Sequence, residues 1–330
     1  MLEWPILLVL GLVLAAEFVN GWTDAPNSIA TVISTRVLPP WAALLMASGF
    51  NLLGAMSGTA VAATIGKGIV APEIINLTTV AAAMVSIVCW STFCYYWGGL
   101  PTSESHALVA GLTGAALATA GPSALIWQGW QKVGMGLLFS TFLGFGVGLL
   151  IMTAMYWIFA KQRPAMIRQV FGKLQILSAA FMAFSHGSND GQKFIGVFSL
   201  VLLLGGVHTT FHVPLWVILL CAVTMGIGTS LGGWRVIRTV GLKLTKLEPV
   251  HGFAAETGAA MTIELATRLG IPLSTTHTIS TALMGVGATR RFSAVRWGVT
   301  RDIVMAWILT FPACGAIAWT VAKGLTWVMR

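Results

Sequence analysis

The sequence predicts an all-α polytopic membrane protein with about ten transmembrane or half-membrane segments, in two inverted five-segment repeats with broken helices and re-entrant hairpins. Three observations support this fold class: an apolar composition, long uncharged runs and two pairs of similar motifs. Of the 330 residues, 56% are hydrophobic and only 9% are charged, and the mean hydropathy is +0.84. Soluble globular proteins average about 25% charged residues. The composition therefore excludes a soluble enzyme, a nucleic-acid-binding domain and a disordered chain.

The apolar runs define the expected segments, since a spanning helix needs about 20 mostly apolar residues. Ten such runs cover residues 4–35, 41–65, 77–99, 104–120, 132–159, 174–204, 212–233, 250–270, 273–289 and 302–323. The first and sixth are long and contain Gly, Asn, Asp and Ser, so we expect a break in each helix. The fourth, eighth and ninth are short or polar, which favours half-helices. No basic stretch precedes the first run, so we expect a membrane segment there and not a signal peptide.

Basic residues gather in three connecting segments that set the expected orientation. The clusters are Lys161, Arg163, Arg168 and Lys173, then Arg235, Arg238, Lys243 and Lys246, then Arg290, Arg291, Arg296 and Arg301. Cytoplasmic loops carry an excess of Lys and Arg, so we expect all three clusters in the cytoplasm. We expect a multi-pass protein of the cell (plasma or inner) membrane whose N-terminus lies outside. This orientation places 13 basic residues inside and five outside. The net charge of +9 thus indicates contact with the lipid bilayer and not with nucleic acid.

The ten runs divide into two halves with similar motifs. We predict an N-terminal repeat over 1–160, a basic cytoplasmic linker over 161–173 and a C-terminal repeat over 174–330. The motif pairs, at offsets of 166 and 171 residues, are GWTDAPNS (21–28) with GSNDGQKF (187–194), and PTSESHALVAGLTGA (101–115) with PLSTTHTISTALMGV (272–286). Because five is an odd number, homologous halves must have opposite orientations. Inverted repeats are typical of secondary transporters, whose binding site lies between the repeats near the membrane midplane.

Ionisable side chains inside the apolar runs are the first candidates for function, because each costs at least about 2.5–3.5 kcal/mol to insert. They are Glu17, Asp24, Glu104, Asp190, Lys193, Glu256 and Glu264. Glu17 and Glu264 are equally well interpreted as interfacial or structural groups. Asp24 and Asp190 occupy equivalent places in the two halves, which favours a functional role.

The expected helix breaks near these aspartates would expose backbone groups inside the membrane. Free carbonyls at one stump, together with Asp24 and Asn27, would bind a cation. The region of Asn189 and Asp190 would do the same in the second half. Free N–H groups at the other stump would favour an anion.

A Pro-x-Ser-x-x-His motif occurs once in each half. Its hydroxyl donors at or near helix starts are Ser103, Ser105, Ser274, Thr275 and Thr276. Two helix N-termini that face each other would hold a tetrahedral oxyanion with neutral donors. Alternatively, these residues are ordinary N-caps, a position that Ser and Thr favour. We interpret His106 and His277, which follow the hydroxyls, as residues that orient the loops.

Together these motifs resemble the inorganic phosphate transporter (PiT) family, in particular its bacterial low-affinity phosphate permeases. The family signature is G-A-N-D-x-x-N-A in both halves, followed in each half by P-x-S-x-S-H or P-x-S-T-T-H. The corresponding strings here are GWTDAPNS and GSNDGQKF, then PTSESH and PLSTTH. Segment 251–277, which contains Glu256, also resembles the family's second-half block. The resemblance implies a homodimeric symporter that moves inorganic phosphate by alternating access, coupled to protons or sodium and without any other cofactor.

By motif, the resemblance divides the site residues into two sets. The phosphate ligands would be Ser103, Glu104, Ser105, Ser274, Thr275, Thr276 and Asn189. The residues for cation or proton coupling would be Asp24, Asn27, Asn189, Asp190, Lys193 and Glu256, with sodium held by Asp24, Asn27 and Asp190.

Two departures from the signature concern coupling: Thr23 and Lys193 stand where the signature has Asn. An ammonium in a sodium site occupies the place of the cation. We therefore expect coupling to protons at least in part, with a proton neutralising Glu104 or Asp24. Glu104 itself would repel an anion unless one of the two is protonated.

Three other functions fit parts of the sequence. A permease for sulfate or another oxyanion would use the same scaffold, although sulfate cannot donate hydrogen bonds to carboxylates as phosphate can. A passive anion channel is the second alternative. An intramembrane hydrolase would use a hydroxyl with His106 or His277, but an enzyme needs one nucleophile and both halves carry the motif.

Overall fold

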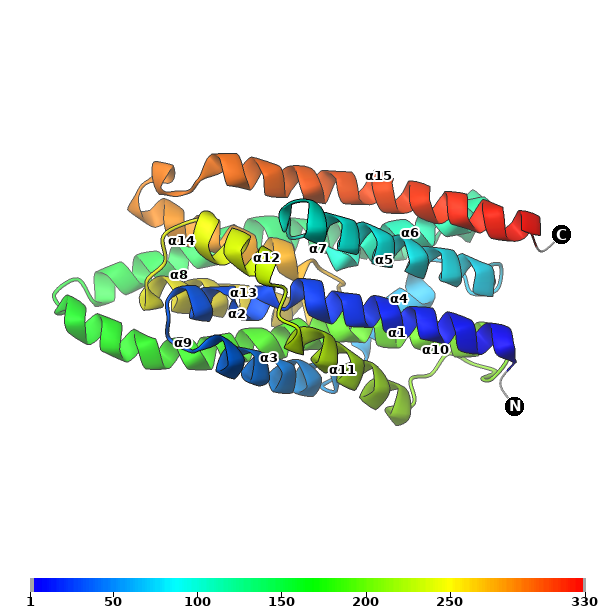
Figure 1. The fold of residues 1–330 in the computed structure, drawn as a ribbon, viewed down its shortest axis with the longest axis horizontal. Coiled ribbons are helices and arrows are strands. Elements are labelled where there is room, and N and C mark those ends of the chain that lie inside the picture. Colours follow the sequence, from blue (N-terminus) through cyan, green and yellow to red (C-terminus); the bar gives the residue numbers. More distant parts are fainter. Residues whose placement is uncertain (1–2, 329–330) are drawn as a thin grey trace.

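The computed structural model describes residues 3–328, and within this range every regular element is a helix. Most helices run along one long axis of the molecule, and α1 begins at the same end at which α15 finishes (Figure 1). Outside the helices, Val70 and Leu125 form an isolated backbone bridge between two loops. The all-α fold that the composition predicts is confirmed.

The first half of the chain runs up to the loop at residues 159–163. Its elements are α1 (Trp4–Asp24), α2 (Pro26–Ser34), α3 (Pro40–Ala55), α4 (Ala60–Gly68), α5 (Leu77–Gly98), α6 (Glu104–Thr119), the short 3-10 helix η1 (Pro122–Ala124), α7 (Trp127–Leu138), the π-helical turn η2 (Phe139–Leu143) and α8 (Gly144–Ile158).

The second half has a similar order of helices, with its π-helical segments at other places. It consists of α9 (Pro164–His186), the π-helical turn η3 (Gly187–Gly191), α10 (Gln192–Leu204), α11 (Leu215–Ser230), α12 (Trp234–Ile237), the π-helical segment η4 (Arg238–Lys243), α13 (Pro249–Arg268), α14 (Thr275–Arg290), the 3-10 helix η5 (Phe292–Ala294) and α15 (Trp297–Val328).

Corresponding elements of the two halves also agree in shape. Helices α3 and α4 are bent by 68°, and the pair of α11 with Trp234–Lys243 is bent by 62°. Helices α6 and α14 have 16 residues each. The continuous stretches Trp127–Ile158 and Trp297–Val328 both have 32 residues. These two bends and these helix lengths therefore occur in the same order in both halves.

The first run is not broken in the way its sequence predicts. Ala25, between α1 and α2, keeps right-handed helical angles (φ −44°, ψ −40°), and its N–H donates to the carbonyl of Gly21 at 3.1 Å. Pro26, which has no N–H, starts α2. In the sixth run, the turn η3 joins α9 to α10 without an interruption. The prediction of two separated helix stumps is wrong, because both backbones stay helical, although Pro26 has no N–H to donate to the carbonyl of Trp22.

The sharp bends lie elsewhere, at residues 56–59 and 231–233. The first of them divides the run predicted over 41–65. The second bend is followed by α12 and η4, which carry part of the second basic cluster and which the ten runs omit. Basic side chains do not prevent helix formation there, since long Lys and Arg side chains can extend from a helix into water.

The linker predicted over 161–173 is also mostly helical, because α9 starts at Pro164 and not at residue 174. Proline is favoured in the first turn of a helix, and the first residues of α9 are largely exposed. Helices α7 and α15 likewise start five residues before the predicted 132 and 302. The connection between the halves is therefore the short loop 159–163.

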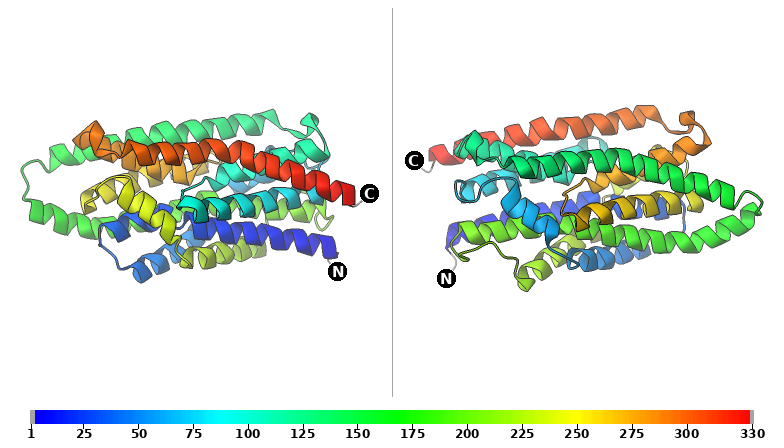
Figure 2. Two further views of the ribbon diagram at one scale, coloured as in Figure 1. Left: turned by 45° about the horizontal axis from the view of Figure 1, so that its top comes forward. Right: turned by 180° about the vertical axis from the view of Figure 1, so that it is seen from behind.

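Four helical stretches of the described chain are long and apolar enough to cross a membrane, and the two bent pairs raise the number to six. The connections α8–α9, η4–α13 and α14–α15 lie together at the end opposite the start of α1 (Figures 1 and 2). The three basic clusters adjoin these connections. Most of the basic residues that the sequence groups in one compartment thus lie toward one end of the molecule, whereas Arg235, at the start of α12, donates to the carbonyl oxygen of Tyr96 at the end of α5.

Two helix pairs approach each other closely at glycines. A Cβ atom at Gly114 of α6 would lie 2.1 Å from the carbonyl oxygen of Gly315 in α15. A Cβ atom at Gly285 of α14 would lie 2.2 Å from the carbonyl oxygen of Phe145 in α8. Neither position has room for a side chain, so backbone contact fixes where α6 and α14 sit.

Gly114→Ala is expected to lower the Tm of the detergent-purified protein, because the added methyl group must push α6 away from α15. Overpacking of this kind costs about 1–3 kcal/mol. Gly11→Ala is the matched control, since nothing lies within 4 Å of a Cβ atom at Gly11. Equal Tm values for the two variants would contradict the close approach.

Candidate functional site

The N-termini of α6 and α14 lie side by side in the interior of the protein. His106 and His277, in the first turns of these helices, have ring centroids 4.6 Å apart. The hydroxyl of Ser105 donates to the carbonyl oxygen of Leu273, just before α14, at 2.6 Å. Because α6 belongs to the first half and α14 to the second, the two Pro-x-Ser-x-x-His motifs form one structural unit.

Asp24, at the end of α1, contacts the start of α14. The hydroxyl of Thr276 donates to Oδ1 and Oδ2 of Asp24 at 3.3 and 3.2 Å. Nδ2 of Asn27 donates to the hydroxyl oxygens of Thr276 and Thr275 at 3.0 and 3.4 Å. All four side chains are buried. Asp24 of the first half therefore accepts the hydroxyl of Thr276 in the second half.

Asp190, in the turn η3, contacts the same hydroxyl row. The hydroxyl of Thr275 donates to Oδ2 of Asp190 at 3.0 Å. Lys193 forms an ion pair with Oδ1 of Asp190 and also donates to the hydroxyl of Ser105 and, at 2.9 Å, to the carbonyl oxygen of Leu273. Its side chain is 1% exposed. Three acceptors satisfy the three ammonium hydrogens, so Lys193 is a fixed internal cation.

Asp24, His186 and Asp190 form a buried group that can hold a cation, since one ligand atom from each lies within 4.8 Å of the others. Nε2 of His186 lies 3.6 Å from Oδ2 of Asp190, and Nδ1 lies 2.9 Å from Oδ1 of Asn51. The motifs of the sequence do not include His186. Its position four residues before Asp190 is the signal that could have identified it, because such pairs share one face of a helix.

Ser103 and Ser274 act as N-caps of α6 and α14. The Ser103 hydroxyl accepts the backbone N–H of His106 at 3.3 Å, and the Ser274 hydroxyl accepts that of His277 at 3.1 Å. A cap of this type satisfies one of the free N–H groups of the first turn. The alternative that the sequence left open, ordinary capping, therefore describes these two residues, whereas Ser105, Thr275 and Thr276 contact the charged groups.

Glu104 and Asn189 lie at the edge of this cluster. Oε1 of Glu104 accepts the hydroxyl of Thr23 at 3.1 Å. Nδ2 of Asn189 donates to the hydroxyl oxygen of Thr267 at 2.8 Å and to the carbonyl oxygen of Ile271 at 3.3 Å. Both side chains are buried. Asn189 thus contacts the loop that leads into α14.

Three other membrane carboxylates have separate polar partners. Glu256 accepts hydrogen bonds from Thr31, Ser178 and, at 3.2 Å, Gln175. Within residues 3–328, no hydrogen bond or ion pair joins Glu256 to the aspartates or to Lys193, so the structure does not bring it together with the other predicted coupling residues. Glu17 accepts from Asn20 at 3.3 Å, which suits the structural interpretation. Glu264 accepts the hydroxyl of Ser188 at 2.7 Å and lies 4.0 Å from Arg268, so it contacts the turn η3 as well as a basic side chain.

The histidine rings contact aromatic groups. His277 stacks on Trp307 of α15 at a centroid distance of 3.7 Å, and His106 lies 4.8 Å from the ring of Phe311. Both ring nitrogens of His277 are buried without a hydrogen-bond partner in the described chain. The rings therefore fix the two helix starts by packing against α15, and their backbone N–H groups complete the caps.

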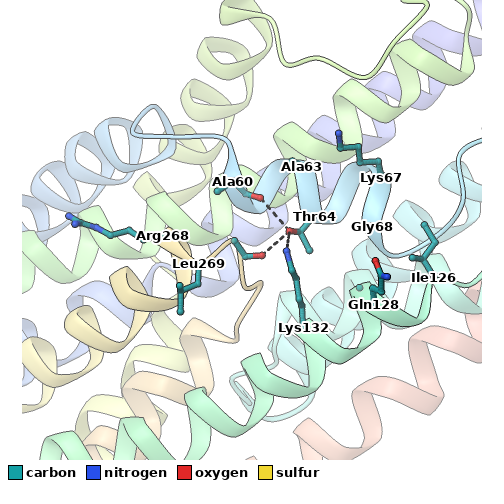
Figure 3. A pocket seen from close by; sticks show the side chains of 12 residues that line it. Ala60, Ala63, Thr64, Lys67, Gly68, Ile126, Gln128, Lys132, Arg268 and Leu269 are labelled. Carbon is teal, nitrogen blue, oxygen red and sulfur yellow. Dashed lines mark hydrogen bonds between the residues drawn. The ribbon is translucent and has the colours of Figure 1, made fainter.

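A cavity of about 450 Å³ lies between α4, α7 and the connection from α13 to α14 (Figure 3). The hydroxyl of Thr64 donates to the carbonyl oxygen of Gly270 at 2.8 Å, at the wall of this cavity. Gly270 belongs to the same loop as Leu273 and Ser274. The cavity and the buried polar cluster thus share a single stretch of backbone.

Comparisons with known proteins place this chain among transport proteins. The model of the Phosphate transporter family matches residues 20–168 and 159–318. A "probable low-affinity inorganic phosphate transporter" of Rhizobium meliloti is 43% identical over 96% of each chain, and one of Bacillus subtilis is 38% identical over 96% of each chain. A solved structure, titled "The sodium-dependent phosphate transporter", has a TM-score of 0.92 at 25% identity, covering 99% of this chain and 100% of its own.

Proposed function

Because this chain belongs to the phosphate transporter family, we propose that it is a secondary active symporter that carries inorganic phosphate across the cell membrane, driven by a proton or sodium gradient. The chain is a multi-pass membrane transporter and not an enzyme, since its relatives are named phosphate transporters and its fold matches that of one. The intramembrane hydrolase considered from the sequence is therefore wrong.

The observation that carries the proposal is the meeting of two buried aspartates with the hydroxyls of Thr275 and Thr276 beside two helix N-termini. Phosphate has one or two protons at neutral pH, so it can donate to the carboxylates while it accepts from hydroxyl and N–H groups. Sulfate has no proton to donate, and a buried acceptor left unpaired costs about 1–3 kcal/mol. This set of donors and acceptors favours phosphate.

The proposed phosphate ligands are the hydroxyls of Ser105, Thr275 and Thr276, with Glu104 and Asn189 at the edge of the site. Ser103 and Ser274 contribute as caps that hold the helix starts in position. Glu104 would accept a hydrogen bond from protonated phosphate, or carry a proton itself, because two unprotonated anions would repel each other.

Alternating access by two inverted repeats is the proposed mechanism. The recurrence of bends, helix lengths and motifs in both halves supports this proposal. So does the composition of the site, since hydrogen bonds between Asp24 and Thr276 and between Lys193 and Ser105 cross from one half to the other. A rocking motion of one half against the other would separate these partners and open the site.

Coupling is proposed to use the aspartates, with Lys193 in place of one cation. The group of Asp24, His186 and Asp190 supports a cation site, and Asn27 lies beside it. The ammonium of Lys193 already balances one of the two aspartate charges, so fewer sodium ions are needed. We propose that a proton balances the remaining negative charge. Glu256 keeps only an indirect role in this scheme, because its hydrogen bonds lead to other residues.

Two further parts of the proposal concern the arrangement in the membrane. The excess of basic residues at one end supports a cytoplasmic location of that end, with the N-terminus outside. The homodimer rests on the family resemblance alone. Its mass in lipid nanodiscs, measured by light scattering, tests it.

Uptake of labelled phosphate by proteoliposomes tests the function, with proton and sodium gradients imposed separately. We expect phosphate to accumulate above its external concentration under at least one gradient, which a passive channel cannot achieve. Excess sulfate should compete weakly. Efficient sulfate uptake with little phosphate uptake would replace the proposal by a sulfate permease.

Thr275→Ala is expected to raise the KM for phosphate several-fold, since a neutral hydrogen bond contributes about 0.5–1.5 kcal/mol. Ser103→Ala, the matched variant, should mainly lower the Tm, because loss of an N-cap costs about 0.5–2 kcal/mol of stability. Uptake at varied phosphate concentration and thermal unfolding measure both effects. An unchanged KM in Thr275→Ala would remove that hydroxyl from the phosphate ligands.

A further inference from the structure

The cavity between α4 and α7 is lined by basic side chains. Lys67, Lys132 and Arg268 contribute to its wall, and among residues 3–328 no carboxylate lines it (Figure 3). The carboxylate recorded within ion-pair distance of Arg268 is Glu264, at 4.0 Å, and the Arg268 side chain is 84% exposed. The cavity therefore combines a volume of about 450 Å³ with an excess of positive charge.

Lys132 is the basic residue directed into this cavity. Figure 3 shows its side chain reaching from α7 toward Thr64 of α4, whereas Lys67 and Arg268 stand at the edges. Nζ of Lys132 lies 3.4 Å from the hydroxyl oxygen of Thr64. Thr64 is the one hydrogen-bond partner that the described chain offers to this ammonium, whose three hydrogens need three acceptors. The remaining hydrogens are available to a ligand.

The cavity adjoins the loop that leads into the proposed phosphate site. Its wall includes Gly270, whose carbonyl oxygen accepts the hydroxyl of Thr64 at 2.8 Å. Three residues later, the carbonyl oxygen of Leu273 accepts from Lys193 at 2.9 Å. The loop from Gly270 to Leu273 thus contacts the cavity of Lys132 on one side and Lys193 on the other. An anion beside Lys132 would need only a movement of this loop to reach the site.

We propose that this cavity, with Lys132 at its centre, is a capture site in which inorganic phosphate binds before it enters the buried site. The proposal rests on the proposed function and adds a second binding position. Cationic walls around a cleft of low dielectric raise the local concentration of an anion. The cavity is large enough for a tetrahedral oxyanion and its water. The side chains of Lys67 and Arg268, at its edges, are long enough to turn toward a bound anion.

The first test measures the reactivity of Lys132 with a water-soluble acetylating reagent, read by mass spectrometry. Inorganic phosphate at four times its dissociation constant should slow acetylation of Lys132 about fivefold, as expected for occupancy of one site. Lys323, which lies over the ring of Trp319 on α15, is the matched control and should react equally fast. Potassium chloride of the same ionic strength should not protect Lys132. Absence of protection by phosphate would overturn the capture site.

The phosphate group of an anionic lipid has the same chemistry, so the labelling is performed in two kinds of nanodisc. One contains phosphatidylcholine alone, and the other also contains phosphatidylglycerol. Protection by free phosphate in both lipids supports the proposal. Protection that requires phosphatidylglycerol and does not respond to free phosphate would assign the cavity to a lipid headgroup and overturn it.

The second test uses uptake by Lys132→Gln, with Lys323→Gln as control. Loss of capture should raise the KM for phosphate about tenfold and leave kcat within about twofold, because the internal site is unchanged. The KM of the wild type should rise with ionic strength more steeply than that of Lys132→Gln. Equal KM values for the two variants would overturn the capture site while the proposed function stands. If the wild type transports no phosphate, the proposed function fails, and the labelling still decides whether an anion binds here.

Discussion

Asp190→Asn is expected to abolish gradient-driven phosphate uptake, with the initial rate in proteoliposomes falling at least about 100-fold. Asp190 is the counter-ion of a buried ammonium and also accepts the hydroxyl of Thr275 at 3.0 Å. Removing one partner of a buried ion pair costs about 3–5 kcal/mol of stability, because it leaves the other charge uncompensated inside the site. The side-chain amide of asparagine would also place its own N–H donors close to Lys193 and Thr275, which are donors themselves.

A loss of uptake has this meaning only if the protein still folds. The double variant Asp190→Asn/Lys193→Asn removes the unpaired ammonium, so its Tm should recover toward the wild-type value while uptake stays abolished. Asp24→Asn is the matched change in the first half, where Thr276 donates to both carboxylate oxygens. It should also abolish uptake, with a smaller loss of Tm, because no lysine is paired with Asp24. Near-normal transport in either single variant would remove that aspartate from the mechanism.

Lys193→Asn is expected to change the driving ion. Wild-type uptake should respond to an imposed pH gradient, because Lys193 already fills one cation position beside Asp190. Asparagine removes the resident charge and restores the residue of the family signature. The uncompensated aspartates, Asn27 and the new amide would then offer oxygen ligands to sodium. The variant should lose most pH-driven uptake and require sodium, as measured with each gradient alone.

Lys323→Asn is the control for the loss of a lysine, because Lys323 lies on α15 beside Trp319. It should keep the ion dependence of the wild type. Wild-type uptake that requires sodium and ignores the pH gradient would refute the role of Lys193 in coupling, and its ion pair would then be purely structural.

Much of the fold follows from composition, because apolar length and uncharged runs decide which segments can enter a membrane. The helix α5 lies within one residue of its predicted bounds, 77–99. The helices divide at the predicted motifs but are not separated there, because buried partners satisfy the side chains of Asp24 and Asp190 within a helical backbone. Thr276 does this for Asp24, and Lys193 for Asp190. Helix α9 starts at Pro164, well before the predicted residue 174, because its first turns are exposed and basic and so have no apolar pattern.

The site was less completely predictable than the fold. The repeated motifs identify the right helix starts, but spacing does not tell a capping hydroxyl from one that faces a carboxylate. Ser103 and Ser105 differ by two positions, and only the first accepts a backbone N–H of its own helix. His186 lies outside both motifs, and Glu256 lies inside a family block but contacts Ser178 and Gln175. Such pairings depend on how distant segments pack.

The turn η3 contains one more residue than an α-helical turn would use, and this has a consequence for insertion and deletion scanning. Removing one residue from 187–191 would let α9 and α10 join as a single regular helix. The wider turn takes up the extra residue locally, so the deletion would leave the rest of α10 on nearly the same face and would change the backbone mainly at η3 itself. Asp190 lies inside this turn, so its carboxylate would lose the position from which it binds Lys193 and Thr275. A helix that is more regular, and a transporter that is inactive, would result from the same deletion.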